Sequence, residues 1–467
     1  MYQFASLRAI LILLLAGLST YLTFKKAKFG VIIFVFLLLL RDSFLRIWFP
    51  PAYDVLHLPR YFAVLTFMSY LFHKREKFYL PSQLWLIFIL FIIICLSRFF
   101  SGTGIFNNKV PGEYLKICII TFLITNTIKT ERDLRQIIIS IMIINAFSAL
   151  YHYYLYRVGS WRSVYIVKSY YLDRNYFAGT LAATSALAYF TFQSDQSSKH
   201  LKILSFFCFI SFIGGVILTE SRSGFLTLSV VLLACVLLDK RRLRIVVPLS
   251  IVLALLFLRV SGSYFDRLST IVNYESDTSA MGRIATNKAA INMMKSHPLL
   301  GIGAGNFNYF FLDYTPDELK QWVRPGKSIH NIFLQTGSET GLIGLTIFTL
   351  IIVSSLIDVI RLRKRCLKDD SLKPLGYKIS ALGVALLGLM VELQFIPGAY
   401  YSYIYILIPL IAAAKPILHN MKSLSPKVEE VRRGETALGG LSEVIVGYIV
   451  RRQIKQVRKG FVGNETI

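Results

Sequence analysis

The chain has 467 residues, of which 55% are hydrophobic, and its mean hydropathy is +0.56. Its 52 lysines and arginines outnumber its 26 aspartates and glutamates, which gives a formal net charge of +26. This composition excludes an ordinary soluble domain, in which about 45–50% of the residues are apolar.

Apolar runs long enough to cross a membrane recur along the whole chain, since a hydrocarbon core about 30 Å thick needs roughly 20 helical residues. The runs are continuous and not alternating, so they predict helices and not a barrel. We therefore expect an all-α protein, a polytopic transmembrane helix bundle of about 12–13 spans. The runs lie near residues 9–23, 29–48, 60–72, 83–98, 114–128, 136–156, 174–192, 203–219, 223–238, 244–260, 331–358, 377–394 and 399–416.

The basic residues gather between these runs, at 25–28, 73–77, 129–135, 239–244 and 361–370. Cytoplasmic loops of membrane proteins are rich in Lys and Arg, and this explains the charge better than binding to nucleic acid does. The alternate segments then lie on the outer side, at 49–59, 99–113, 157–173, 220–222, 261–329 and 395–398.

Four parts follow from this topology: an N-terminal transmembrane bundle at 1–260, a long outer loop at 261–329, C-terminal transmembrane helices at 330–418 and a basic cytoplasmic tail at 419–467. A loop this long in a compact protein is usually functional. In the tail, residues 446–461 have apolar and basic positions at helix spacing, which fits either the anionic inner leaflet or a solvated segment.

The long loop is expected to contain an amphipathic helix with Arg283 near its first turn, ended by the His297-Pro298 pair. Its apolar positions are Ile284, Ala285, Ala289, Ile291 and Met294. Downstream, "GIGAG" at 301–305 follows no predicted strand, so a tight glycine turn is favoured over a dinucleotide site.

Motifs for nucleotides and metals are missing from the sequence. It contains no DxD motif and no GxxxxGK[ST] phosphate loop, and its five cysteines form no CxxC pair. We therefore expect no cofactor and no metal.

Polar groups instead gather on the expected outer side. Arg222 and Glu220 lie in "TESRSGFLTL" at a short junction between two apolar runs, where a basic side chain can snorkel but lipid-facing charge is costly. His330 opens an apolar helix, and an imidazole with its unperturbed pKa of about 6.5 suits proton transfer. A cap formed by Ser328 and Asn331 would explain the polarity there but not the imidazole.

Further along the same helix, Gly337 and Gly341 have the GxxxG spacing typical of close helix packing. Glu339 lies a turn or two deeper than His330 and could partner an arginine.

These motifs together resemble the O-antigen ligase and polymerase family, bacterial membrane enzymes that act on polyprenyl-diphosphate-linked glycans. The matching motifs span roughly residues 170–350 and comprise "DRNYFAG" at 173–179, "SRSG" at 221–224, Arg283, "HPLLGIGAGNF" at 297–307 and "HN" followed by "ETGLIGL" at 330–345.

The resemblance implies that Arg222 and Arg283 hold the diphosphate of the lipid carrier and that His330 accepts the proton of the acceptor hydroxyl. Guanidinium binds phosphate bidentately and would stabilise the departing diphosphate without a metal. The further binding residues that we expect are Asn331, Asn175, Arg174, Glu220 and Glu339. Attack from the opposite face would invert the anomeric configuration.

The resemblance also implies a bacterial inner membrane protein whose active site faces the periplasm. Its partners would be membrane lipid, an undecaprenyl diphosphate-linked glycan and either lipid A–core or a second glycan. Ligation to lipid A–core is the first expectation and polymerisation of repeat units is the alternative. A glycan-lipid transporter is a third, although it predicts internal repeats, which we do not find.

Overall fold

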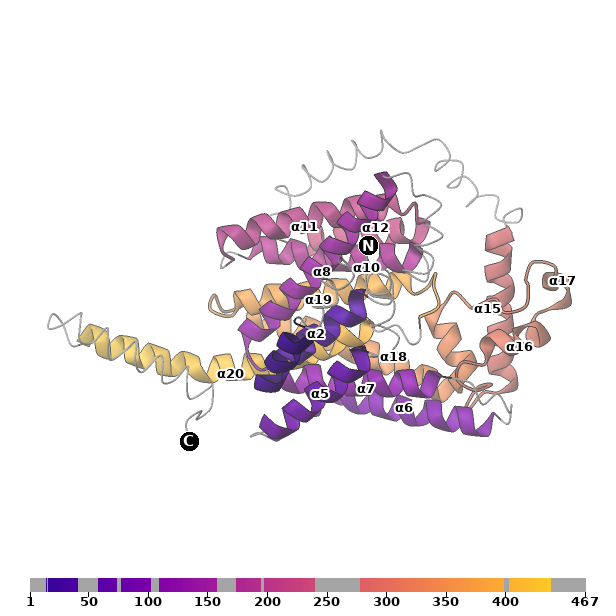
Figure 1. Ribbon diagram of the computed structural model, residues 1–467, viewed down its shortest axis with the longest axis horizontal. Coiled ribbons are helices and arrows are strands. Elements are labelled where there is room, and N and C mark those ends of the chain that lie inside the picture. Colours follow the sequence, from indigo (N-terminus) through magenta and orange to yellow (C-terminus); the bar gives the residue numbers. More distant parts are fainter. Residues whose placement is uncertain are drawn as a thin grey trace. The chain divides into compact units, whose positions relative to one another are not determined.

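The computed structural model describes residues 14, 16–40, 58–73, 77–101, 109–157, 174–194, 197–239, 278–398 and 403–437. Within these ranges every regular element is a helix, which confirms the all-α expectation (Figure 1). The named helices are α2 (Ala27–Leu40), α5 (Leu58–His73), α6 (Ser82–Phe100), α7 (Val110–Thr127), α8 (Glu131–Arg157), α10 (Arg174–Gln193), α11 (Lys199–Leu218), α12 (Arg222–Leu238), α15 (Thr278–Ser296), α16 (Phe307–Tyr314), α17 (Asp317–Lys320), α18 (Ile332–Cys366), α19 (Lys373–Glu392) and α20 (Ile404–Ala437).

Contacts divide the chain into two units, Met1–Ala414 and Lys415–Ile467. The first unit contains the helix bundle and every predicted site residue. The expected boundaries of the four parts stay predictions, and the tail stretch at 446–461 lies outside the described residues.

Six helices in the described part of the chain are long and apolar enough to cross a membrane, and three shorter apolar helices accompany them. α7 and α10 match predicted spans but are not among these. The predicted span at 244–260 lies outside the described residues, so the expected number of spans stays a prediction. On α6 and α11, large apolar side chains such as Trp85 and Phe207 are exposed, as contact with lipid would require.

α10 lies inside the bundle, packed against α8, α11, α12 and α19. Every side chain from Phe177 to Phe190 is buried. Small residues make this close packing possible: a Cβ atom added to Gly179 would lie 2.3 Å from Cγ of Glu392 on α19.

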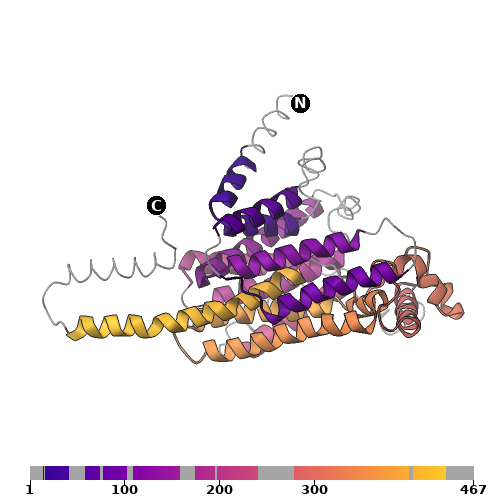
Figure 2. The same cartoon turned by 90° about the horizontal axis from the view of Figure 1, so that it is seen from below.

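Polar contacts hold helix ends together on the side that the charge pattern predicts to be cytoplasmic. At one end, Lys28 Nζ lies 2.8 Å from Asp133 Oδ1, and Arg363 Nη2 donates to the Leu238 carbonyl at 3.0 Å. Each of these two contacts involves a predicted cytoplasmic segment. The opposite end carries α15, α16 and α17 (Figures 1 and 2). Which end faces the periplasm stays a prediction.

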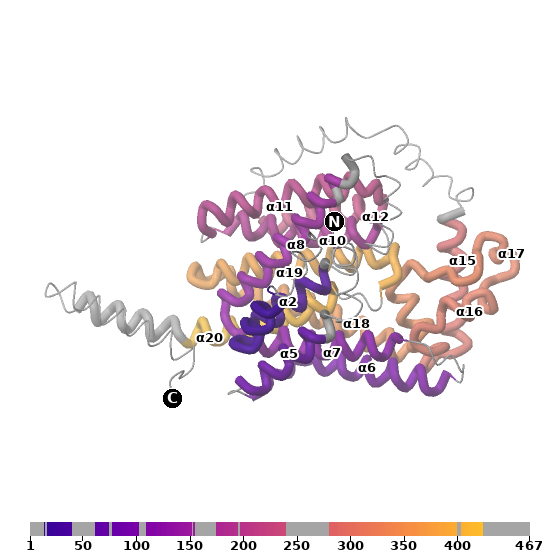
Figure 3. Tube along the Cα trace, in the orientation of Figure 1, coloured from indigo at the N-terminus to yellow at the C-terminus, as the bar shows by residue number. Residues whose placement is uncertain are grey.

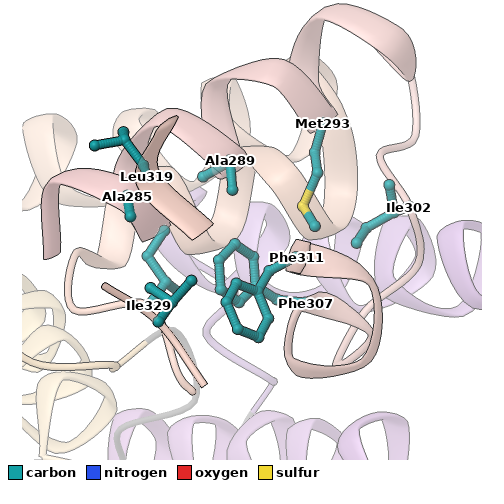
Figure 4. Packing of buried hydrophobic residues seen from close by; sticks show 10 residues of the cluster. Ala285, Ala289, Met293, Ile302, Phe307, Phe311, Leu319 and Ile329 are labelled. Carbon is teal, nitrogen blue, oxygen red and sulfur yellow. The ribbon is translucent and has the colours of Figure 1, made fainter. Parts of the chain in front are cut away.

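A small helical layer with its own apolar core is formed by α15, α16 and α17 (Figure 4). The three helices lie in one group in the chain trace (Figure 3). α15 confirms the helix predicted here, but it begins at Thr278, which places Arg283 in its second turn and not near its first. Ile291 was expected on the apolar face and is 41% exposed. The buried face of α15 is the one that packs against the aromatic rings of α16. It consists of Ala285, Ala289, Ala290 and Met293.

α18 is interrupted at Gly341, whose φ of 70° and ψ of −173° are not helical. Backbone groups left open in a membrane helix must find other partners, and the loop at 297–306 supplies them. The carbonyls of Ser338 and Glu339 accept hydrogen bonds from Ile302 N at 2.9 Å and Gly303 N at 3.1 Å, and Leu342 N donates to Pro298 O at 2.7 Å. "GIGAG" is therefore a turn that docks onto the break, and Gly341 serves this contact and not a helix-packing face.

Replacing Gly341 with alanine is expected to lower the free energy of unfolding by more than about 1 kcal/mol. The positive φ disfavours a side chain, and an added Cβ atom would lie 2.1 Å from the Leu299 carbonyl oxygen. Thermal unfolding of the purified variants measures this. Gly214→Ala is the control, because an added Cβ atom there meets no atom within 4 Å, and equal melting temperatures for the two variants would contradict the account.

Candidate active site

The start of α12 holds Arg222 between two anchored serines. Ser221 is the N-cap, accepting from Gly224 N at 3.0 Å, and its Oγ donates to Asn175 Oδ1 on α10 at 2.6 Å. Ser223 Oγ donates to Glu392 Oε1 on α19 at 2.7 Å. The backbone of Arg222 is therefore fixed from both sides.

The residue before this cap, Glu220, has a φ of 51°. A residue with a side chain adopts this left-handed conformation at a cost of about 1–3 kcal/mol, and such strain is found mainly at functional sites. The tight turn lets α12 begin directly after α11, with the side chains of Glu220 and Arg222 at the same bundle end.

Glu392 is a site residue that the sequence analysis missed. Its side chain is 1% exposed, and besides Ser223 it accepts from Thr227 Oγ1 at 2.9 Å. The signal was present, since Glu392 is the only acidic residue in the predicted span at 377–394 and such residues mark functional positions in membrane proteins.

At the start of α18, Asn331 is the N-cap and His330 directly precedes it. Asn331 Oδ1 accepts from Phe333 N at 3.0 Å and from Leu334 N at 3.1 Å. Ser328, which we considered as part of the cap, instead accepts from Asn308 Nδ2 at 3.2 Å. The Nδ1 atom of His330 is buried, so the imidazole is held outside the cap and within the protein.

The last residue of α19 and the two residues after it join the two helix starts. Asn331 Nδ2 donates to Gln394 Oε1 at 3.1 Å, and Ile332 N donates to the Leu393 carbonyl at 2.9 Å. Glu392, in contact with α12, is two residues before Gln394. The segments that carry Arg222 and His330 are therefore fastened to one short stretch of chain.

Replacing Glu392 with alanine is expected to reduce the activity that the family resemblance implies by up to about 100-fold, because displacing a group of a candidate active site costs rate even when the change lies outside the reacting atoms. Glu392→Gln keeps one acceptor oxygen and should recover part of the loss. Initial rates in membranes with matched protein levels measure both effects. Glu318→Ala, an exposed site, is the control, and a normal rate for Glu392→Ala would refute the positioning role.

α15, which carries Arg283, is in contact with the segment that carries His330 and leads into α18. Near the start of α15, a Cβ atom added to Gly282 would lie 2.4 Å from Lys327 Nζ. Near the end of α15, Met294 Sδ would lie 2.8 Å from a Cβ atom added to Gly337 of α18. The chain from 327 to 337 therefore follows α15 from 282 to 294 in the same direction. His330 accordingly lies beside the α15 stretch that starts at Arg283.

The remaining predicted residues have different surroundings. Arg174 is exposed at the start of α10, next to Asn175. Glu339 is 2% exposed in the last turn before the break in α18, and its carbonyl oxygen also accepts from Ser97 Oγ at 2.6 Å. Glu339 thus lies under the glycine loop.

No group of three or more His, Cys, Asp or Glu side chains within the described ranges is arranged to hold a metal ion. Two cations lie together near the start of α15, where burial, and then the nearby Arg283 guanidinium, lower the pKa of Lys327. The arrangement is suited to binding an anion beside an imidazole.

The helical fold and the polar bundle end define a multi-pass membrane protein, and residues 206–349 match the family model described as O-antigen ligase. The match includes Arg222, Arg283 and His330, and it confirms the resemblance predicted from the motifs. The chain is also similar to the exopolysaccharide production protein ExoQ of Rhizobium meliloti (strain 1021), with 23% identity over 321 residues, covering 62% of this chain and 67% of the relative.

Proposed function

We propose that this protein is a glycosyltransferase that moves a glycan from a polyprenyl diphosphate carrier to an acceptor hydroxyl. The observation that carries the proposal is the convergence of the Arg222 and His330 segments on the end of α19, at the bundle end where α15 brings Arg283 beside the His330 segment. The membrane fold supports a lipid-anchored substrate, and the matched family supports glycan chemistry.

In the proposed reaction, the acceptor oxygen attacks the anomeric carbon from the face opposite the diphosphate. The bond between that carbon and the diphosphate oxygen breaks, and its electron pair stays on the diphosphate. Arg222 and Arg283 stabilise the charge that develops there. His330 takes the hydroxyl proton, so that polyprenyl diphosphate leaves and the transferred glycan has inverted configuration. The step requires neither ATP nor a metal, because the diphosphate linkage supplies the driving force.

The acceptor distinguishes two forms of this function. Ligation of O-antigen to lipid A–core is the first candidate, supported by the description of the matched family. Joining of exopolysaccharide or O-antigen repeat units is the second, supported by the name of the relative. Either reaction places the protein in a bacterial inner membrane with its site toward the periplasm.

Deleting the gene and separating the carrier-linked and lipopolysaccharide fractions on a gel tests this proposal. Long glycan that accumulates on the carrier beside a bare core indicates ligation. Cores capped with one repeat, or loss of polymeric exopolysaccharide, indicate polymerisation. An unchanged pattern in a strain without a second such gene would contradict the proposed function.

A further inference from the structure

Lys327 and Asn287 lie along the α15 contact described above and have no role in the proposed reaction. Lys327 is half-buried in the segment before His330, with its ammonium group over Gly282. Across the described part of the chain it forms no ion pair with a carboxylate, whereas Lys320, in the same helical layer, is paired with Asp317 at 2.7 Å.

The charged group that acts on Lys327 is another cation, Arg283. Burial lowers the pKa of its ammonium group, and Arg283 lowers it further. An ammonium group held partly buried beside a guanidinium is destabilised unless an anion lies next to it. A bound phosphate would remove that penalty, since hydrogen bonds between ionised groups are about twice as strong as neutral ones.

Asn287 adds a polar group one helical turn from this cation pair. It is four residues after Arg283 on α15, and residues at this spacing are neighbours on one helix face. Its Oδ1 atom is buried and accepts no hydrogen bond. Leaving such an acceptor unsatisfied is costly, and a hydroxyl donor would satisfy it.

The same face continues to Met294, which contacts Gly337 of α18. The face from Arg283 to Met294 therefore lies against the chain that carries His330. A ligand bound by Arg283 and Lys327 would extend along Asn287, beside the chain segment that carries His330.

We infer that Lys327, Asn287 and Arg283 form a subsite for a sugar diphosphate. In this subsite Lys327 binds the diphosphate, and Asn287 Oδ1 accepts a hydrogen bond from a hydroxyl group of the first sugar. This inference rests on the proposed function and assigns two substrate-binding residues that the family motifs do not contain. It also predicts that the two residues recognise different parts of the same donor.

Binding of two probes to the full-length protein in nanodiscs tests the subsite: undecaprenyl diphosphate alone, and the same carrier bearing a glycan. Lys327→Gln is expected to weaken the binding of both probes about tenfold, the loss of one charge-assisted hydrogen bond. Asn287→Ala should weaken only the glycan-bearing probe, by about fivefold. Lys288→Gln, which removes an exposed charge from the same helix, should bind both probes as the wild type does.

Equal affinities for Lys327→Gln and Lys288→Gln would overturn the role of Lys327, and equal weakening of both probes by Asn287→Ala would overturn the role of Asn287. Circular dichroism of each variant shows whether a loss reflects misfolding, and Lys327→Arg, which keeps the charge, should restore binding. Wild-type protein that binds neither probe would contradict the proposed function itself, and with it the subsite.

Discussion

Replacing His330 with alanine is expected to slow glycan transfer at least about 100-fold while leaving the protein folded. A positioned general base contributes about 10²- to 10⁴-fold to the rate, so kcat should fall by that factor. Folding should persist because the cap of α18 is formed by Asn331 and not by the histidine. Initial rates in reconstituted membranes, together with the melting temperature, measure the two effects separately.

His200→Ala is the matched control, since this histidine is exposed in the first turn of α11. It should leave both the rate and the melting temperature unchanged. If transfer continued at a near-normal rate in the His330 variant, the base would have to be reassigned, and Glu220 and Glu339 would be the first groups to examine.

Replacing Arg283 with lysine is expected to reduce kcat/KM by about 100-fold, although the positive charge is kept. A guanidinium presents two parallel donors to a phosphate, whereas an ammonium acts as a point charge. Loss of one preorganised donor at a developing anion typically costs about 10²- to 10³-fold. Kinetics with the lipid-linked donor at several concentrations separate weaker binding from slower chemistry.

Arg361→Lys is the control for this change, because Arg361 is exposed in a predicted cytoplasmic segment. Near-normal glycan synthesis by the Arg283→Lys variant would remove the bidentate contact from the mechanism. A similar loss in both variants would indicate a general effect of the substitution on the protein.

The sequence predicted those parts of the site that depend on local patterns. The apolar spacing after Arg283 predicted α15, and the glycines of "GIGAG" predicted a tight turn, because such features are encoded within a few residues. The polar start of α18 was explained in part by Asn331, whose cap involves only its own helix.

Features that depend on distant segments were not predicted. The break at Gly341 is stable because a loop some forty residues earlier in the chain supplies its hydrogen bonds, and the GxxxG spacing alone favoured helix packing. Glu392 has its role because α10, α12 and α19 meet around it. The position of Lys327 beside Arg283 likewise follows from the parallel course of two segments, which no local pattern encodes.

The central claim is that the chain transfers a glycan from a polyprenyl diphosphate to a hydroxyl group. Its most direct test is reconstitution of the purified protein with a lipid-linked glycan and a hydroxyl acceptor in the presence of a chelator. The account predicts that polyprenyl diphosphate is released in a one-to-one ratio with a product of inverted anomeric configuration, and that the His330→Ala variant releases it at least about 100-fold more slowly. Movement of intact lipid-linked glycan across the membrane with no diphosphate released would contradict it.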